Sequence, residues 1–308
     1  MLRKLYICNG RLVEVDGDNV QPLVFVYVAP NDAEKKELVE QYKIDEHTLT
    51  SALDPDELSR LEFEPEHVAI IFKRPRHHSA EDNFLFKVVS AGLFMFNDKL
   101  IVVMAEDAPL FEGKLFMKVQ TIQDILLKII HRSVFHFLEH LRAINMLAGS
   151  LEHLISTSME NKYLLNLFTL EKSLVYYYNA VNSNSALIEK LKYNASKIGF
   201  SQENMEFLDD LTIENNQCRE QANIYSQVLA SLMDARASII ANNLNIRIKA
   251  LTILTIAIML PTLVVSIFSM NVKLPIEQEE SVQSFWIIAS MALLSSLIVA
   301  LFWWRKKW

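Results

Sequence analysis

The chain has 308 residues, a formal net charge of −7, and 51% hydrophobic against 22% charged residues. Its apolar residues are concentrated near the C-terminus, where residues 250–272 and 281–304 carry no charge. Each run exceeds the ~20 residues that cross a bilayer core as a helix, which argues against a purely soluble protein. The acidic net charge argues against a nucleic-acid-binding protein, and six scattered glycines provide no phosphate loop for nucleotide-driven transport.

Residues 1–120 are typical of a cytoplasmic α/β domain with its own core. Four runs rich in β-branched and aromatic side chains are expected strands, at residues 23–28, 68–72, 93–96 and 100–103. The last two flank a turn at Asn97-Asp98. Cys8 and Cys218 lie far apart without a partner motif, so neither a disulfide nor a cysteine zinc site is expected.

Long helices are expected after this domain. No proline occurs between Pro109 and Pro261, so helix breakers are almost absent from this stretch. The expected interruptions are the polar residues 182–185 and the segment 198–201. They divide the stretch into predicted helices at 117–147, 150–181, 186–197 and from 202 onward. Residues 121–200 are therefore assigned to a cytoplasmic helical segment and residues 201–249 to a stalk helix.

Two C-terminal transmembrane helices are predicted at 250–270 and 284–304, with an external loop at 271–283. Basic residues flank the spans on one side, namely Arg247, Lys249, Arg305, Lys306 and Lys307. The positive-inside rule then places both termini in the cytoplasm of a multi-pass protein of the inner (plasma) membrane, with 305–308 as a basic tail. Two buried core helices of a soluble protein are the alternative.

Polar and thioether side chains recur on one face of the first predicted span. Steps of three and four residues connect Asn245, Ile248, Thr252, Thr255, Met259, Thr262, Ser266 and Ser269. Intervening residues such as Ile253 and Val264 are apolar and suit lipid or a neighbouring helix. The stripe predicts a water-filled pore, which two spans can enclose only in a ring of identical subunits. Packing of membrane helices through small residues is the alternative.

The C-terminal segments follow one another in a characteristic order. Residues 249–255 (Lys-Ala-Leu-Thr-Ile-Leu-Thr) lead to Ser269-Met270-Asn271, a short acidic loop, the second span and a terminal Arg-Lys-Lys. This order resembles the CorA family of divalent-cation channels, and residues 52–58 and 107–111 are similar to that family's N-terminal domain. The resemblance implies a homopentamer with a cytoplasmic funnel, a pore lined by the first span, and magnesium as the commonest cargo.

Ser269-Met270-Asn271 stands where the family has Gly-Met-Asn, and related zinc-transporting members also change this tripeptide. The resemblance implies that the amide oxygens of Asn271 form a ring that holds a hydrated cation at the outer mouth, which suits Mg²⁺. A helix C-cap is the alternative role for this asparagine. Three loop residues are expected either to raise the cation concentration near the mouth or to be merely solvated: Glu277, Glu279 and Glu280.

An ungapped count from Asn271 carries further family roles onto this chain. The polar relay and the hydrophobic constriction of the family correspond to Thr262, Met259, Leu251, Ile248 and Asn245. A narrow apolar ring can gate a pore by dewetting. The same count places Asp210 on an acidic position that binds regulatory magnesium between neighbouring cytoplasmic domains. Alternatively, Asp209-Asp210 caps a helix start or complements its dipole.

The sequence also contains His136-Phe137-Leu138-Glu139-His140, which matches the H-x-x-E-H pattern of inverted zinc peptidases. The pattern is short, no third ligand is identifiable, and the surrounding segment is rich in histidine. A solvated or interhelical pair of histidines is the preferred interpretation.

The expected function is therefore Mg²⁺ influx through a homopentameric channel, without covalent catalysis or a cofactor. Magnesium is the cargo and a candidate regulatory ligand. The expected partners are other copies of the chain, membrane lipid and divalent cations, and no nucleic acid. A zinc or other transition-metal transporter, with or without proton coupling, is one alternative. A non-conducting membrane-anchored sensor or scaffold is the other.

Overall fold

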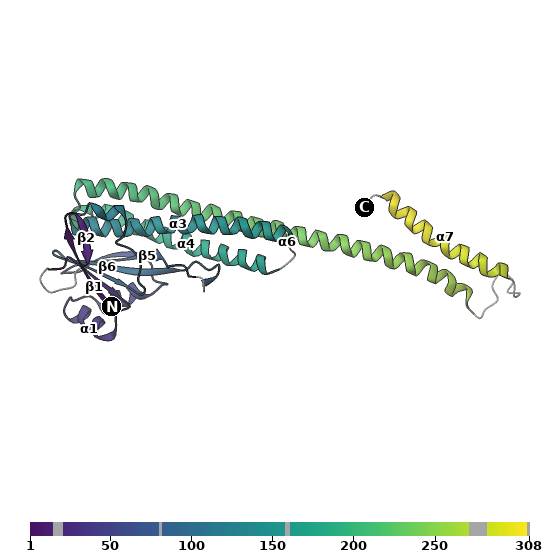
Figure 1. The fold of residues 1–308 in the computed structure, drawn as a ribbon, viewed down its shortest axis with the longest axis horizontal. Helices are drawn as coiled ribbons and strands as arrows, with labels where there is room; N and C mark the ends of the chain where they lie inside the picture. Colours follow the sequence, from purple (N-terminus) through teal and green to yellow (C-terminus); the bar gives the residue numbers. More distant parts are fainter. Residues whose placement is uncertain (15–20, 80–81, 158–160, 271–281, 307–308) are drawn as a thin grey trace. The chain divides into compact units, whose positions relative to one another are not determined.

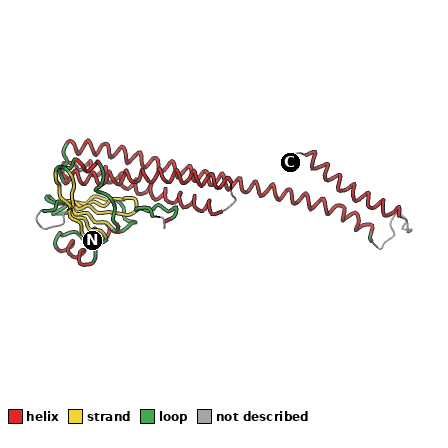
Figure 2. Tube along the Cα trace, in the orientation of Figure 1, coloured by secondary structure: helices red, strands yellow, loops and turns green. Residues whose placement is uncertain are grey.

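The computed structural model describes residues 1–14, 21–79, 82–157, 161–270 and 282–306 (Figure 1). The chain divides into two compact units, Met1–Met233 and Asp234–Trp308. Helix α6 (Gln202–Phe268) contributes residues to both units. All described strands belong to the first unit, and the second unit is helical throughout its regular structure (Figure 2).

A seven-stranded sheet forms the centre of the first unit, in the order β2-β1-β3-β7-β6-β5-β4. Strands β3 and β7 pair in parallel, and the other described neighbours pair antiparallel. The strands span Leu2–Cys8 (β1), Arg11–Glu14 (β2), Val24–Val28 (β3), Arg60–Phe63 (β4), Val68–Pro75 (β5), Val88–Met95 (β6) and Leu100–Met104 (β7). The central strands are almost continuously apolar because helices cover both faces of the sheet.

The four strands predicted from the sequence are confirmed as β3, β5, β6 and β7. The amide of Phe96 donates to the carbonyl of Lys99 at 2.9 Å, which closes the β6–β7 hairpin around Asn97-Asp98. Gly92 on β6 is required by a close approach, since an added Cβ would lie 2.6 Å from the Cβ of Ala52. Any larger residue would push helix α2 (Glu46–Leu53), which carries Ala52, away from the sheet.

Strands β1, β2 and β4 were not predicted. Strands β1 and β2 form a hairpin whose turn is Asn9-Gly10, with φ values of 51° and 75°. Two consecutive residues with positive φ are the signature of a type I′ turn, for which Asn-Gly is the preferred pair. The Asn9-Gly10 dipeptide is therefore the feature of the sequence from which this hairpin could have been predicted.

Two pairs of helices cover the two faces of the sheet. Helices α1 (Asp32–Glu40) and α2 (Glu46–Leu53) enclose a small core that includes Leu38, Leu49 and Phe94. Helices α3 (Ile122–Thr157) and α4 (Asn161–Tyr193) cover the other face over a larger core. The domain core is thus shared between the expected α/β segment and the expected helical segment.

The predicted helix boundaries are partly wrong. A short 3₁₀ helix occupies Lys114–Met117, and α3 begins only at Ile122, after a reciprocal cap in which the amides of Thr121 and Asp124 each donate to the other's side chain at 3.1 Å. Helix α3 continues past the predicted end at 147 because Gly149 costs a helix interior only about 1 kcal/mol relative to alanine. Helix α4 likewise continues through residues 182–185.

Asn184 explains why the polar segment does not interrupt α4. Its side-chain amide donates to the backbone carbonyl of Lys73 at 2.8 Å and its Oδ1 accepts from the backbone amide of Lys73 at 2.9 Å. Strand β4 does not extend far enough to pair with Lys73 of β5. The side chain of Asn184 provides the two backbone hydrogen bonds that a longer neighbouring strand would make there. Ser133 on α3 donates to the same carbonyl at 3.0 Å, and the Lys73 ammonium donates to the Pro55 carbonyl at 2.6 Å.

The interruption predicted at 198–201 is confirmed. The short helix α5 (Ala195–Ile198) ends at Gly199, whose φ of 81° is the left-handed conformation that glycine adopts at helix ends. Helix α6 then begins with a reciprocal cap, in which Asn204 N donates to Ser201 Oγ at 3.2 Å and Ser201 N donates to Asn204 Oδ1 at 3.1 Å.

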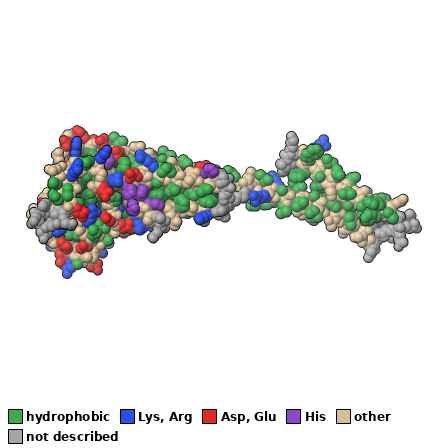
Figure 3. Space-filling view, in the orientation of Figure 1, with side chains coloured by type: hydrophobic (Ala, Val, Ile, Leu, Met, Phe, Trp, Pro, Cys, Tyr) green, Lys and Arg blue, Asp and Glu red, His purple; other side chains and the backbone are tan. Residues whose placement is uncertain are grey.

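The second unit contains the end of α6 and helix α7 (Val282–Lys306). Both helices hold a window with a mean hydropathy of 2.4, and 0% of each window is buried. The alternative of two buried core helices is therefore wrong for the described structure. Apolar side chains dominate the surface of this unit, whereas acidic side chains are visible mainly on the first unit (Figure 3).

Candidate functional site

One face of α6 in the second unit is partly covered. The half-buried residues recur every three or four positions and are Ile253, Ala257, Pro261, Val264 and Phe268. On α7 the half-buried residues include Ala289, Ala292, Ser295 and Val299, and the helix lies beside α6 within this unit (Figure 1). Small residues at a helix contact let two membrane helices approach closely. This face of α6 therefore packs toward α7.

The part of the predicted polar stripe from Thr255 to Ser269 lies on the opposite side of α6, whereas Ile248 and Thr252 also border the space between α6 and α7. Thr255 and Met259 each lie two residues beyond a half-buried position, and Thr262 lies two residues before one. Two residues correspond to about 200° around an α-helix, so these side chains point away from α7. All eight stripe residues are exposed, from Asn245 to Ser269.

The threonine hydroxyls of the stripe are oriented by the helix itself. Thr252 donates to the carbonyl of Ile248 at 2.9 Å, Thr255 to that of Leu251 at 2.9 Å, and Thr262 to that of Ile258 at 2.7 Å. A hydroxyl has one proton and two lone pairs, so each oxygen keeps acceptor capacity after donating to the backbone. The stripe therefore offers a row of hydrogen-bond acceptors.

Leu251 and Ile248 interrupt this row with apolar surface at the basic end of the span. Their exposed fractions are 64% and 52%, so neither contributes to the core of the single chain. Met259 is similarly exposed at 63%. The stripe is thus polar along most of its length and apolar near Lys249.

Helix α6 ends immediately before the altered tripeptide. Ser269 N donates to the carbonyl of Val265 at 3.1 Å, and Ser269 Oγ donates to that of Ser266 at 3.1 Å. Met270 is exposed. Asn271 and the loop residues Glu277, Glu279 and Glu280 lie outside the described residues.

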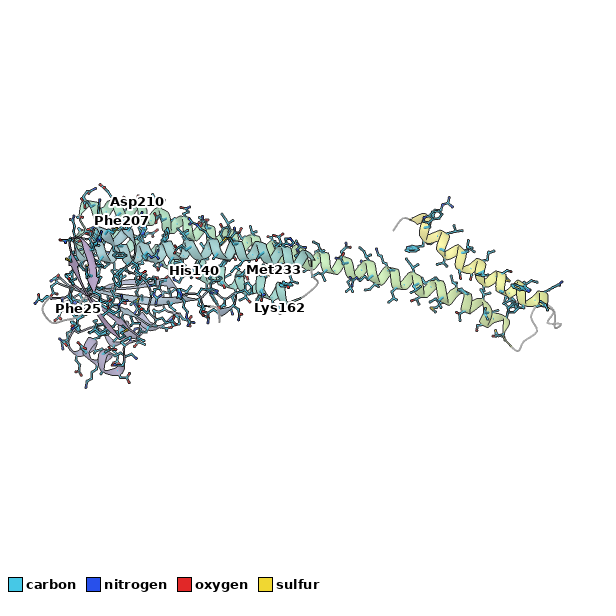
Figure 4. The ribbon with its side chains drawn as sticks, viewed as in Figure 1. Phe25, His140, Lys162, Phe207, Asp210 and Met233 are labelled. Atoms are coloured by element: carbon cyan, nitrogen blue, oxygen red, sulfur yellow. The ribbon has the colours of Figure 1, made fainter. Side chains whose placement is uncertain are left out.

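Asp210 lies on the surface of the first unit, two turns into α6 (Figure 4). The helix start is capped by Ser201 and Asn204, and Asp209 forms an ion pair with Lys192. Asp209 and Asp210 lie beyond the first turn of α6, to which both capping and the favourable dipole interaction are confined. The alternative in which this pair caps the helix or complements its dipole is therefore wrong. Asp210 keeps an exposed carboxylate.

The H-x-x-E-H segment packs between helices. The rings of His136 and His140 lie 4.4 Å apart, and His140 Nδ1 is hydrogen-bonded to the Tyr177 hydroxyl of α4 at 2.6 Å (Figure 4). Burial, with smaller effects of nearby cationic groups, lowers the pKa of His136 to about 4 and that of His140 to about 3. Within the described ranges no three metal-ligating side chains are grouped to hold an ion.

These histidines predict a loss of stability in acid. Their pKa values are lowered on folding, so the unfolded chain binds protons first as the pH falls below ~6.5. At pH 5 the loss is at most about 2 kcal/mol per ring and smaller after solvent screening. Thermal unfolding of the solubilised protein is expected to shift to lower temperature between pH 7 and pH 5. His136→Phe should reduce this shift.

Comparison with known proteins gives the same architecture. The model of the family described as CorA-like Mg²⁺ transporter protein matches residues 24–307. The cobalt/magnesium transport protein CorA of Methanocaldococcus jannaschii is 24% identical over 315 residues, which cover 98% of this chain and 96% of that protein.

Solved structures share this fold. The complete CorA magnesium transporter structure from the same organism matches with a TM-score of 0.82 and 20% identity, and covers 99% of this chain and 96% of the other. The cytoplasmic domain of ZntB from Vibrio parahaemolyticus matches 78% of this chain and 98% of its own length, with a TM-score of 0.60 and 11% identity. The match over nearly the whole chain places this protein in the CorA-like Mg²⁺ transporter family, whose members are transporters of divalent cations.

Proposed function

We propose that the protein forms a homopentameric channel that admits Mg²⁺ to the cytoplasm, with spans at 250–270 and 284–304. The observation that carries this proposal is the exposed polar stripe, whose residues Thr255, Met259 and Thr262 lie on the side of α6 opposite α7. A row of hydroxyls and amides facing lipid would be unfavourable, because lipid tails offer no hydrogen-bond partners. Five copies placed around an axis would turn the stripes toward a common aqueous path.

The stripe suits a cation that keeps its water. Mg²⁺ dehydrates reluctantly, and the water molecules of its shell donate outward hydrogen bonds. The oxygens of Thr252, Thr255 and Thr262 already donate to the helix backbone and so accept from these waters. Met259 lies between Thr255 and Thr262 on this path, and Asn245 continues it toward the inner end.

Leu251 and Ile248 form the proposed constriction. Five apolar side chains at one level exclude water when the pore is narrow, which blocks a hydrated ion without a plug. A modest widening of the ring restores conduction. The membrane potential favours entry of a dication by ~4.6 kcal/mol at 100 mV, so influx needs no bound fuel.

At the outer end, Ser269, Met270 and Asn271 form the proposed mouth. The amide oxygens of Asn271 would hold the hydrated ion, while Glu277, Glu279 and Glu280 would concentrate cations near it. This arrangement requires both termini to lie in the cytoplasm of a plasma-membrane protein, as the positions of Arg247 and Arg305 suggest.

Asp210 is the proposed contribution of this chain to a regulatory Mg²⁺ site between neighbouring cytoplasmic units. Its exposed carboxylate supports the proposal, since oxygen ligands suit this ion. Asp210→Ala is expected to move inhibition of flux by internal Mg²⁺ to at least about threefold higher concentration, and to reduce Mg²⁺-dependent protection from protease. Asp209→Ala is the neighbouring control. Unchanged inhibition and protection in Asp210→Ala would contradict the regulatory role.

Flux into proteoliposomes tests the function as a whole. The purified protein is expected to carry Mg²⁺ at least about tenfold faster than protein-free vesicles, with and without a pH gradient. Zinc, cobalt and nickel are measured separately, because the related protein is named a cobalt/magnesium transporter. Transport of Zn²⁺ that requires a pH gradient would favour the proton-coupled alternative. No flux of any of these ions would favour the non-conducting sensor.

A further inference from the structure

A groove of about 710 Å³ lies between α6 and α7 within the second unit. It is lined on α6 mainly by apolar residues near Lys249 and on α7 by residues near its C-terminal end. The α6 side includes Ile246, Ala250, Ile253 and Ile256, and the α7 side includes Ile298, Val299, Phe302 and Trp303. The lining of the groove is therefore mainly apolar, and it includes the ionisable side chain of Lys249.

The position of the groove in the bilayer follows from its charged end. Lys249 and Arg247 precede the first apolar run, and Arg305 follows the second, so this end of the unit is basic. Trp303 lies in the same wall, and tryptophan prefers the boundary between lipid headgroups and hydrocarbon. From Lys249 to Ile256 the helix rises about 10 Å, which reaches well into one leaflet of the bilayer.

An apolar groove at this depth is filled by hydrocarbon, since water gains no partners there. A lipid of the same leaflet has both an acyl chain of suitable length and a headgroup at the level of Lys249. The ammonium of Lys249, with Arg247 two residues before it and Arg305 two residues after Trp303 of the groove wall, favours a negative headgroup by about 1 kcal/mol per basic residue. We propose that the groove binds one acyl chain of an anionic phospholipid, with the lipid phosphate at Lys249.

The bound chain would touch the proposed constriction. Ile248 and Thr252 border the groove as well as belonging to the stripe. A chain in the groove supports the outer side of the helix where Ile248 and Leu251 narrow the pore, so its loss would alter gating. This consequence rests on the proposed function, whereas lipid binding itself does not.

Lipid retention measured by native mass spectrometry tests the site independently of flux. Full-length protein is released from nanodiscs of equal phosphatidylglycerol and phosphatidylcholine. Wild type is expected to retain phosphatidylglycerol at least about threefold over phosphatidylcholine. Ala250→Trp and Val299→Trp fill the groove and should lose this retention, while Lys249→Gln should lose the preference for the anionic lipid. Leu293→Trp, at a position of α7 that is 70% exposed and outside the lining, is the matched control.

The outcomes separate the two proposals. Equal retention in wild type, Ala250→Trp and Val299→Trp would overturn the lipid site, as would a disulfide between cysteines placed at position 250 in one copy and position 299 in another. Preferential retention without Mg²⁺ flux would support the lipid site and contradict the channel. The oligomer mass of each variant is recorded with the lipid count, so that a misfolded variant is recognised and replaced by the other groove-filling variant.

Discussion

Leu251→Ser is expected to raise Mg²⁺ flux under inhibiting internal Mg²⁺ by at least about tenfold. Leu251 is exposed on the same face of α6 as Ile248 and Thr255 of the stripe, and a ring of five would present apolar side chains at one level of the proposed pore. Serine replaces that surface with hydroxyls that hold water, so the dewetting barrier falls. A tenfold increase corresponds to a reduction of only about 1.4 kcal/mol in the barrier.

Leu254→Ser is the matched control for this experiment. Leu254 is 57% exposed on the same helix but lies outside the stripe. Leu254→Ser therefore makes the same change of side chain without altering the proposed ion path. Both variants are reconstituted at equal protein content and assayed for Mg²⁺ uptake at high and low internal Mg²⁺. An equal effect of the two substitutions, or none from Leu251→Ser, would be incompatible with a constriction at this residue.

Asn271→Ala is expected to reduce Mg²⁺ flux at least about tenfold while the oligomer stays intact. The substitution removes the amide oxygens that the proposed mouth would offer to hydration water, and a hydrogen bond to a charged group contributes about 1.5–3 kcal/mol. Proteoliposome uptake measures the loss. The mass of the solubilised protein, expected near five copies of 35.4 kDa, verifies assembly.

Ser269→Gly is the companion variant and should preserve flux. It restores the family's glycine and removes a hydroxyl that donates to Ser266, a bond that the helix end does not require. A shift of selectivity toward Mg²⁺ over cobalt and nickel is the expected gain. Undiminished Mg²⁺ flux in Asn271→Ala would show that selection occurs elsewhere along the pore.

The sequence predicted those parts of the fold whose signal is local. Strands β3, β5, β6 and β7 are apolar runs between turn residues, and the two C-terminal helices are charge-free runs of sufficient length. Asn184 shows where this reasoning fails, because a polar residue that suggests a helix break is instead paired with the backbone of a strand 111 residues away. Such a long-range partner leaves no trace in neighbouring residues.

The candidate site could be predicted from the sequence only in part. Helical periodicity alone brought Thr252, Thr255 and Thr262 onto one face, and family resemblance supplied the roles of Asn271 and Asp210. The side of α6 that faces α7 and the groove near Lys249 depend on how two separate helices approach each other. A pattern along one segment cannot encode that approach.

Lys73 joins four parts of the first unit at one residue. Its backbone holds Asn184 of α4 and Ser133 of α3, and its ammonium holds the carbonyl of Pro55 and the hydroxyl of Ser90. Sliding α3 and α4 over the sheet would break several of these bonds together, at about 1 kcal/mol each and more for the buried charge. The bonds at Lys73 therefore resist internal shear of this unit. We therefore expect a motion that opens the proposed channel to bend the chain outside this unit, and hinge mutations to act in the residues of α6 beyond Met233.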